Sequence, residues 1–298
     1  MSEVGAKATE QEATQRRVEA GLRAVRAHTE YMHAHFGRAA SMWKHDGTRV
    51  TEVDLAISKG VFARLREEFP EDQFFSEETE PGGAPVPLTA RFAWIIDPVD
   101  GTNNYALGVP ACAISLALLR EGEPVCGLVY DLGARVLVHG GPELGLYADG
   151  VSIERRPEPT GETRIVAMHS PIDAQHMPLV NAVLENYKLR AYGSGALHLT
   201  YVALGRIDAC LDFTVKVWDI AAAWALCRAS GVEAWFLSGT VFPLREFDLH
   251  MRPVRYLAAP AGAMARLRPH LERLLASLPT GGDGAPEHQS KHGAEEDL

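Results

Sequence analysis

The sequence lacks the features of membrane proteins and of nucleic-acid-binding proteins. No apolar run approaches the roughly 20 residues of a membrane-spanning helix, and the polar start MSEVGAKATEQEATQRR has no apolar segment typical of a signal peptide. Lys and Arg form no block, and 39 acidic against 29 basic residues give a formal net charge of −10. Binding that neutralises nucleic-acid phosphates is therefore not expected as the main activity. We expect a cytoplasmic protein with neither a membrane nor a nucleic-acid partner.

Cysteine is scarce, and several familiar catalytic motifs are missing. The four cysteines form no CxxC pair and stand in apolar surroundings, which predicts buried, reduced thiols: Cys112, Cys126, Cys210 and Cys227. The sequence contains no HExxH, no P-loop and no GxGxxG after a strand. His33 and His35 are two positions apart on a predicted helix, so they cannot face one site. No side chain stands out as a covalent nucleophile.

The apolar residues are numerous enough for a large core. The chain has 298 residues, of which 46% are hydrophobic, so one large domain or two of moderate size are expected. Apolar spacing predicts helices over 14–36 and 54–69. The segment RFAWII predicts a strand, and 111–141 reads as a meander of three antiparallel strands.

From residue 164 onward the pattern changes to alternating strands and helices. Such alternation indicates a second α/β layer, and the break ERRPEPTGE places a soft boundary near 155–162. We therefore predict an α/β fold with an N-terminal α+β domain over 13–158 and a C-terminal α/β domain over 159–278. The polar ends, 1–12 and 279–298, are predicted to be disordered.

The stretch WIIDPVDGTNNY carries two aspartates where a buried strand ends, the place where ligands often bind in α/β sheets. Pro98 holds Asp97 in an extended conformation, so Asp97 and Asp100 can point to one side of a turn. Two carboxylates and the Val99 carbonyl suit a hard cation such as Mg²⁺. A turn followed by a helix cap explains the same residues about equally well.

Three further acidic segments weigh against the simple turn. Each has an ordinary interpretation: Glu77 and Glu78 as surface charge, Asp219 as a helix cap, and Asp54 as part of a capping box with Thr51. Lys216 before Asp219 is interpreted as a residue that caps a strand. All of these ordinary interpretations together are much less plausible than any one alone.

Taken in order, VTEVD, SEET, WIIDPVDGTNNY, GSGALHLTYVALGRIDA and WDIAAAWALCRASG resemble the inositol monophosphatase family of Mg²⁺-dependent, lithium-sensitive phosphatases. The resemblance spans roughly Val18 to Leu275. Its motif D-P-[aliphatic]-D-G-T-x-N-[aromatic] is matched throughout by Asp97 to Tyr105. It implies a sugar-phosphatase αβαβα sandwich with the active site between its two parts, and a homodimer.

The resemblance also implies a role for each matched residue. Two or three Mg²⁺ per site, with Mn²⁺ able to substitute, would be held by Glu77, Asp97, Val99, Asp100 and Asp219. Glu77 and Thr102, the latter supported by Asp54, would activate the attacking water. The substrate contacts would be Val99, Asp100, Gly101, Thr102, Gly193, Ser194, Gly195, Asp212 and Asp219.

Three departures from the family pattern concern the substrate more than the metal. Ser76 replaces a glycine, Asp212 replaces a longer glutamate that touches the alcohol, and Ser230 stands in the usual A-G-G. A serine at a position of positive φ would be strained, and we expect Ser76 to be tolerated. A shorter acid at 212 leaves a gap or suits a different alcohol.

The function that follows is hydrolysis of a small phosphate monoester by metal-activated water, with myo-inositol monophosphate as lead substrate. Paired metals suit this slow reaction because they stabilise charge on both the entering and the leaving oxygen. Histidinol phosphate, fructose 1,6-bisphosphate and 3′-phosphoadenosine nucleotides are the alternatives within the family. An alternative of another class is a protein-binding module with vestigial activity.

Overall fold

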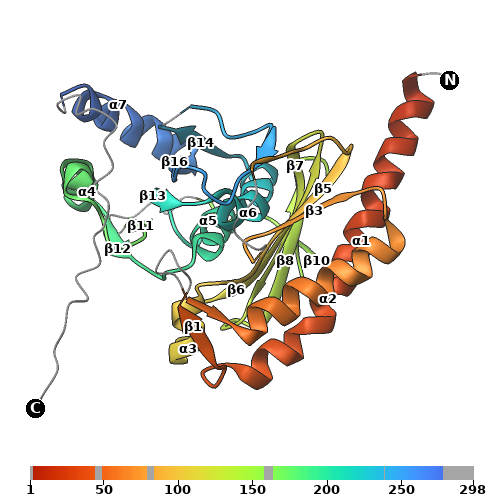
Figure 1. Cartoon of the computed structure of the whole chain (residues 1–298). Coiled ribbons are helices and arrows are strands. Elements are labelled where there is room, and N and C mark those ends of the chain that lie inside the picture. The colour runs from red at the N-terminus through yellow and green to blue at the C-terminus, as the bar shows by residue number, and fades with distance from the viewer. Residues whose placement is uncertain (1–2, 44–48, 79–83, 158–163, 238, 278–298) are drawn as a thin grey trace, which may run out of the picture.

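The computed structural model describes residues 3–43, 49–78, 84–157, 164–237 and 239–277. Helices and sheets alternate in five layers, with two sheets separated by a pair of helices and each sheet covered by helices on its other face (Figure 1). The predicted αβαβα sandwich is therefore confirmed. The proposed domain boundary at 158/159 falls in residues 158–163, which lie outside the described residues.

The first sheet has seven strands in the order β10-β9-β8-β7-β6-β5-β3. Its neighbours pair antiparallel except β3 with β5, which are parallel. The strands are β3 (Gln73–Ser76), β5 (Phe92–Asp100), β6 (Ala113–Arg120), β7 (Glu123–Asp131), β8 (Val136–Gly141), β9 (Gly145–Ala148) and β10 (Val151–Ile153). The predicted strand 91–96 and the three-strand meander are confirmed.

Two helices, α1 (Glu3–His35) and α2 (Glu52–Glu68), cover the outer face of this sheet (Figure 1). Val25, Ile57 and Trp94 are among the fully buried side chains of this layer. Residues 3–12, part of the segment 1–12 that was predicted to be disordered, continue α1 toward the N-terminus. This segment has no apolar periodicity, but it is rich in Ala, Glu and Gln, which favour helix. The other segment predicted to be disordered, 279–298, lies outside the described residues.

The second sheet has five strands in the order β12-β11-β13-β16-β14. Its strands are β11 (Ile165–Ala167), β12 (Lys188–Arg190), β13 (Ala209–Val215), β14 (Val232–Phe236) and β16 (Val254–Pro260). The outer face is covered by α4 (Met177–Leu184), which follows the short helix η1 (Ala174–His176), and by α7 (Ala261–Ser277). Strands β12, β11 and β13 are parallel, so their carboxyl ends lie at one edge.

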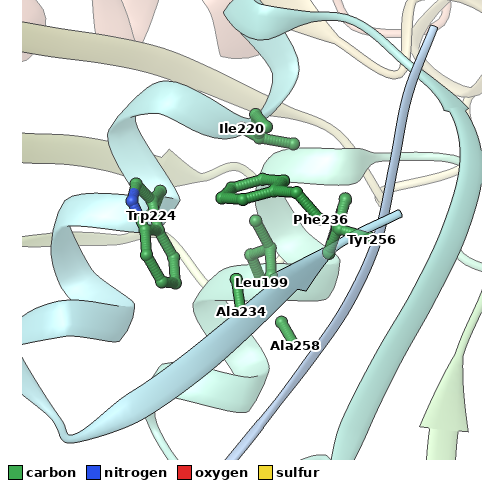
Figure 2. Close-up of a pocket in the computed structure, with 7 residues that line it drawn as sticks. All are labelled: Leu199, Ile220, Trp224, Ala234, Phe236, Tyr256 and Ala258. Carbon is green, nitrogen blue, oxygen red and sulfur yellow. The ribbon is translucent and has the colours of Figure 1, made fainter. Parts of the chain in front are cut away.

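The central layer consists of α5 (Gly195–Ala203) and α6 (Val217–Ala229), between the two sheets (Figure 1). Close packing of α6 on β7 depends on Gly127, because a Cβ there would lie 1.9 Å from the Ala222 carbonyl oxygen. A small apolar hollow lies between this layer and the second sheet, lined by Leu199, Ile220, Trp224, Ala234, Phe236, Tyr256 and Ala258 (Figure 2).

The remaining elements are short: α3 (Thr102–Leu107), the pair β1 (Ser41–Trp43) and β2 (Arg49–Thr51), and the pair β4 (Val86–Pro87) and β15 (Glu246–Phe247). All four cysteines are free and buried, as predicted. None of the helices in the described ranges combines the length and apolarity that crossing a bilayer demands.

Candidate active site

The end of β5 presents two buried acids on an irregular piece of strand. The regular pairing of β5 with β6 is interrupted between Asp97 and Asp100, and the Val99 N–H donates to Asp97 Oδ1 at 3.1 Å. The chain then turns at Gly101, whose φ is +89° and whose Cβ would lie 2.9 Å from the Ala111 carbonyl. Only glycine fits that conformation easily. The motif therefore forms a tight turn that also carries two inward carboxylates.

Asp219 joins these two acids from a different layer of the molecule. Oxygens of Asp97, Asp100 and Asp219 lie within 4.8 Å of one another. Asp219 is the third residue of α6 and accepts from the Lys216 N–H at 2.7 Å. The predicted capping role of Asp219 and its proximity to the β5 acids are thus both present. Lys216 precedes α6, and its Nζ donates to the Met251 carbonyl.

Glu77 follows β3 and approaches the same cluster. Its N–H donates to the Ile96 carbonyl at 3.3 Å, one residue before Asp97, and its charge raises the pKa of Asp97 after burial, the larger cause. Ser76 lies in extended strand and is absent from the non-glycine residues of positive φ. Its hydroxyl accepts from Ser58 Oγ at 2.8 Å and from the Glu78 N–H at 3.0 Å.

Thr102 is linked to both β5 and α2. Its Oγ1 lies 2.9 Å from the Val99 carbonyl and 3.3 Å from Asp54 Oδ1. Asp54 in turn accepts from the Thr51 N–H at 2.8 Å and from the Thr51 hydroxyl. The capping box predicted for Thr51 and Asp54 is confirmed, and the same carboxylate supports Thr102.

These acids are held where negative charge is costly. Burial raises the pKa of Asp219 to about 8, and repulsion by Asp100 and Glu77 adds to it. Burial also raises the pKa of Asp54 to about 6, and it raises the pKa values of Asp97 and Asp100. A divalent cation would remove both the desolvation cost and the mutual repulsion. This set of oxygen donors therefore fits a hard cation.

The predicted Gly193–Gly195 segment begins α5 and contacts the cluster through Asp100. Asp100 Oδ2 accepts from Ser194 Oγ at 2.5 Å and from the Ala196 N–H at 2.7 Å, and Oδ1 lies 3.3 Å from the Gly195 nitrogen. Ser194 is fully buried, whereas Gly193 is exposed. The acids at the end of β5 are therefore in hydrogen-bond contact with the start of α5.

A link through Asn104 fixes this arrangement from α3. Its Nδ2 donates to the Ala111 carbonyl at 2.8 Å and to the Tyr192 carbonyl at 2.5 Å. The Asn of the β5 motif thereby ties α3 to the loop before α5.

Asp212 lies on β13 and has no exposed surface. Its oxygens lie within 3.4 Å of His169 and His198, which were not predicted as site residues. Burial opposes ionisation of Asp212, but the two histidines outweigh it and lower its pKa. Burial likewise disfavours the His169 cation, yet the charge of Asp212 raises the pKa of His169 to about 9. The sequence feature that could have revealed His169 is its position as the polar residue directly after the apolar strand RIVAM.

Comparison with known proteins supports the same interpretation. A sequence model of the inositol monophosphatase family matches residues 9–278. The chain belongs to this family. It is 30% identical to human inositol monophosphatase 2 over 230 residues, which cover 73% of this chain and 76% of the relative. The chain is therefore a phosphoric monoester hydrolase of the inositol-phosphate phosphatase type, in a family of metal-dependent phosphatases.

Two further comparisons concern the breadth of the family and its fold. The chain is 27% identical over 227 residues to fructose-1,6-bisphosphatase/inositol-1-monophosphatase of Thermotoga maritima, covering 75% of this chain and 86% of that one. The crystal structure of extragenic suppressor protein suhB from Bartonella henselae superposes with a TM-score of 0.74 at 22% identity. That superposition covers 86% of this chain and 98% of the other, so the fold is shared nearly throughout.

Proposed function

We propose that this family member hydrolyses small phosphate monoesters, with myo-inositol monophosphate as lead substrate. The observation that carries the proposal is the convergence of Asp97, Asp100 and Asp219 within 4.8 Å, from elements of two layers. Buried acids in such number, with raised pKa values, are a feature of sites that bind cations and phosphate. Fructose 1,6-bisphosphate, histidinol phosphate and 3′-phosphoadenosine nucleotides are the alternative substrates.

The cofactor we propose is Mg²⁺, two or three ions per site, with Mn²⁺ able to substitute. Carboxylates of Glu77, Asp97, Asp100 and Asp219 and the carbonyl of Val99 would hold it, since Mg²⁺ prefers a few carboxylates and retains positions for water and phosphate. Bound Mg²⁺ would supply charge neutralisation on the phosphate oxygens and favour ionisation of water.

The protein's own groups would position the water and the phosphate. Glu77 would accept the proton of the attacking water as a general base. The Thr102 hydroxyl would orient the same water, because the Val99 carbonyl at 2.9 Å and Asp54 Oδ1 at 3.3 Å hold it in position. Backbone N–H groups of Gly101 and Thr102 would bind the phosphate oxygens. We further propose a cytoplasmic homodimer inhibited by lithium.

A panel of phosphate monoesters tests the substrate. The purified protein, with Mg²⁺ or Mn²⁺, should release phosphate from myo-inositol 1-phosphate with a higher kcat/KM than from fructose 1,6-bisphosphate, histidinol phosphate or 3′-phosphoadenosine 5′-phosphate. A higher kcat/KM for one of the other esters would make that ester the lead substrate instead. Release from none of these esters would contradict the proposal and favour the protein-binding alternative.

A further inference from the structure

His169 lies at the edge of the second sheet that is closest to the acidic cluster. It follows β11, which runs parallel to β13, the strand that carries Asp212. The His169 N–H donates to Asp212 Oδ1 at 2.5 Å, so the two residues stay side by side at the carboxyl ends of their strands. Ligands of α/β sheets commonly bind beyond these ends.

Asp212 is a fully buried carboxylate whose oxygens are surrounded by donors. Oδ2 lies 3.3 Å from the Tyr256 hydroxyl, 3.2 Å from Cys210 Sγ and 3.4 Å from His198 Nδ1. Tyr256 is also one of the residues that line the apolar hollow of Figure 2, and its ring lies 6.3 Å from that of Phe236 between centroids. A carboxylate with this number of donors is ionised and has no surface left for a ligand.

A second metal site at His169, His198 and Asp212 is disfavoured by the proton on His198. The Tyr192 N–H donates to His198 Nε2 at 3.0 Å, so this nitrogen is the acceptor. The proton of the neutral ring is therefore on Nδ1, which faces Asp212. A ring with both nitrogens engaged has no lone pair for a metal.

The His169 ring is placed differently, because it extends toward Gly195 at the start of α5 and Asp219 at the start of α6. Its Nδ1 is buried 3.3 Å from Asp212 Oδ2 without the geometry of a hydrogen bond, and the nearby carboxylate favours a proton on this nitrogen. The Cε1 atom lies 3.4 Å from the point where a Cβ of Gly195 would be, and Asp219 Cβ lies 3.1 Å from the same point. The side chain is 19% exposed, and Nε2 has no hydrogen-bond partner among the described residues.

We propose that His169 contacts the alcohol part of the substrate through Nε2, and that Asp212 is a positioning residue acting through His169. This inference rests on the proposed phosphatase activity and adds to it a residue that selects the alcohol. The ring offers one nitrogen without a partner among the described residues at this position, while its other nitrogen lies 3.3 Å from Asp212 Oδ2. A single nitrogen of this kind matches one hydroxyl group near the esterified carbon, as in a polyol phosphate.

The test compares two esters that differ in hydroxyl groups, myo-inositol 1-phosphate and cyclohexyl phosphate. In His169→Ala, the ratio of kcat/KM for the first to that for the second should fall roughly 10- to 100-fold, the range expected for loss of a buried hydrogen bond to substrate. His169→Gln should restore part of the ratio because its amide reaches the position of Nε2, whereas His169→Asn should not. As a matched control, His139→Ala alters a buried histidine of β8 stacked on Tyr147 and should leave the ratio unchanged.

The role of Asp212 is tested by a double-mutant cycle. Asp212→Asn should lower the ratio alone but add nothing in the His169→Ala background, because both act through one contact. A further fall in the double variant would show that Asp212 touches the substrate itself and would overturn the assignment. An unchanged ratio in His169→Ala would also overturn it, provided the wild type hydrolyses both esters.

A binding measurement that needs no turnover completes the test. Mg²⁺, phosphate and myo-inositol are added to the wild-type protein, and the Nε2 resonance of His169 is followed in a long-range ¹H–¹⁵N spectrum. This resonance should shift with myo-inositol and should not shift when cyclohexanol replaces it. Equal shifts with both alcohols would contradict the inference. Failure of the wild type to hydrolyse either ester would instead remove the proposed function.

Discussion

At the scale of single residues, the site consists of acids that are unfavourable without a partner. Asp97 and Asp100 are buried beside the half-buried Asp219, and desolvation is the largest cause of their raised pKa values. Functional sites often retain such costs because the charge is needed for binding. The cost should be visible in the stability of the metal-free protein.

The pH dependence of stability without divalent metal tests this cost. Asp219 has a pKa of about 8 in the folded protein against an ordinary 3.8, so the folded state binds more protons than the unfolded state between these values. The free energy of unfolding in EDTA should therefore fall as pH rises from about 4 to about 8. Urea denaturation at several pH values measures it. A rise over this window would contradict the account, and Asp219→Asn should flatten the slope.

Ser76 gives a second prediction for a single residue. Ser76→Gly would restore the usual family residue, yet it removes hydrogen bonds to Ser58 Oγ and the Glu78 N–H and adds backbone freedom in a strand. We expect a loss of about 1–2 kcal/mol in the free energy of unfolding. Equal or greater stability of the glycine variant would show that serine is strained there.

The sequence predicted the acids of the site better than their surroundings. Asp97 and Asp100 lie at the end of β5 and Glu77 follows β3, each at a point where apolar residues stop, and this signal is local. His169 carries the same signal, but its partner Asp212 is 43 residues away. No local pattern shows that the carboxylate at 212 is enclosed by other side chains.

At the scale of elements, α1 is attached to the first sheet by a buried ion pair. Arg17 contacts Asp72 with 2.8 Å between Nη2 and Oδ1, with side chains 7% and 1% exposed. Trp94 Nε1 also donates to Asp72 at 2.9 Å, and the Arg17 guanidinium lies over the Phe92 ring at 3.9 Å. Removal of Asp72 leaves the buried Arg17 charge with only the exposed carboxylate of Glu71, 2.8 Å from Arg17 Nη2, and leaves the Trp94 N–H without its acceptor.

Asp72→Ala should therefore lower the free energy of unfolding by about 3–5 kcal/mol. Glu68→Ala is the matched control, because Glu68 and Arg23 form an exposed ion pair with side chains 44% and 60% exposed. That control should change stability by at most about 1 kcal/mol. Thermal or urea unfolding measures both, and equal losses would contradict a special role for the buried pair.

Elements with clear periodicity were predicted, and those with local interruptions were missed. The meander follows its apolar pattern closely, and α5 and α6 belong to the strand–helix alternation predicted from residue 164 onward. No helix was predicted at α7, which contains Pro269, a residue that usually ends a helix. No strand was predicted at β3, whose four residues are too few for alternation to be recognised. Its place in the sheet comes from pairing with β5, a tertiary contact.

At the scale of the whole molecule, one helix layer joins the two sheets. The core around α5 and α6 contains residues of both halves, including Ile95 from β5 and Ala258 from β16. The acidic cluster combines β5 with the start of α6, so the site depends on the same contact between layers.

Gly127→Ala tests this contact. The added Cβ would lie 1.9 Å from the Ala222 carbonyl, so α6 must move away from β7. We expect a loss of about 1–3 kcal/mol in the free energy of unfolding and weaker Mg²⁺-dependent activity, because Asp219 moves with α6. Unfolding curves and initial rates measure the two effects. A variant as stable and active as the wild type would show that the layers separate without cost.

The central claim is that Asp97, Asp100 and Asp219 form a catalytic metal site. It is tested most directly by phosphate release from myo-inositol 1-phosphate during a Mg²⁺ titration, with wild-type protein and Asp100→Asn compared side by side. The wild type should show no turnover in EDTA and saturable turnover with Mg²⁺. The folded variant should have a kcat/KM lower by about 10³-fold or more. Turnover that needs no divalent metal, or that survives Asp100→Asn unchanged, would contradict the account.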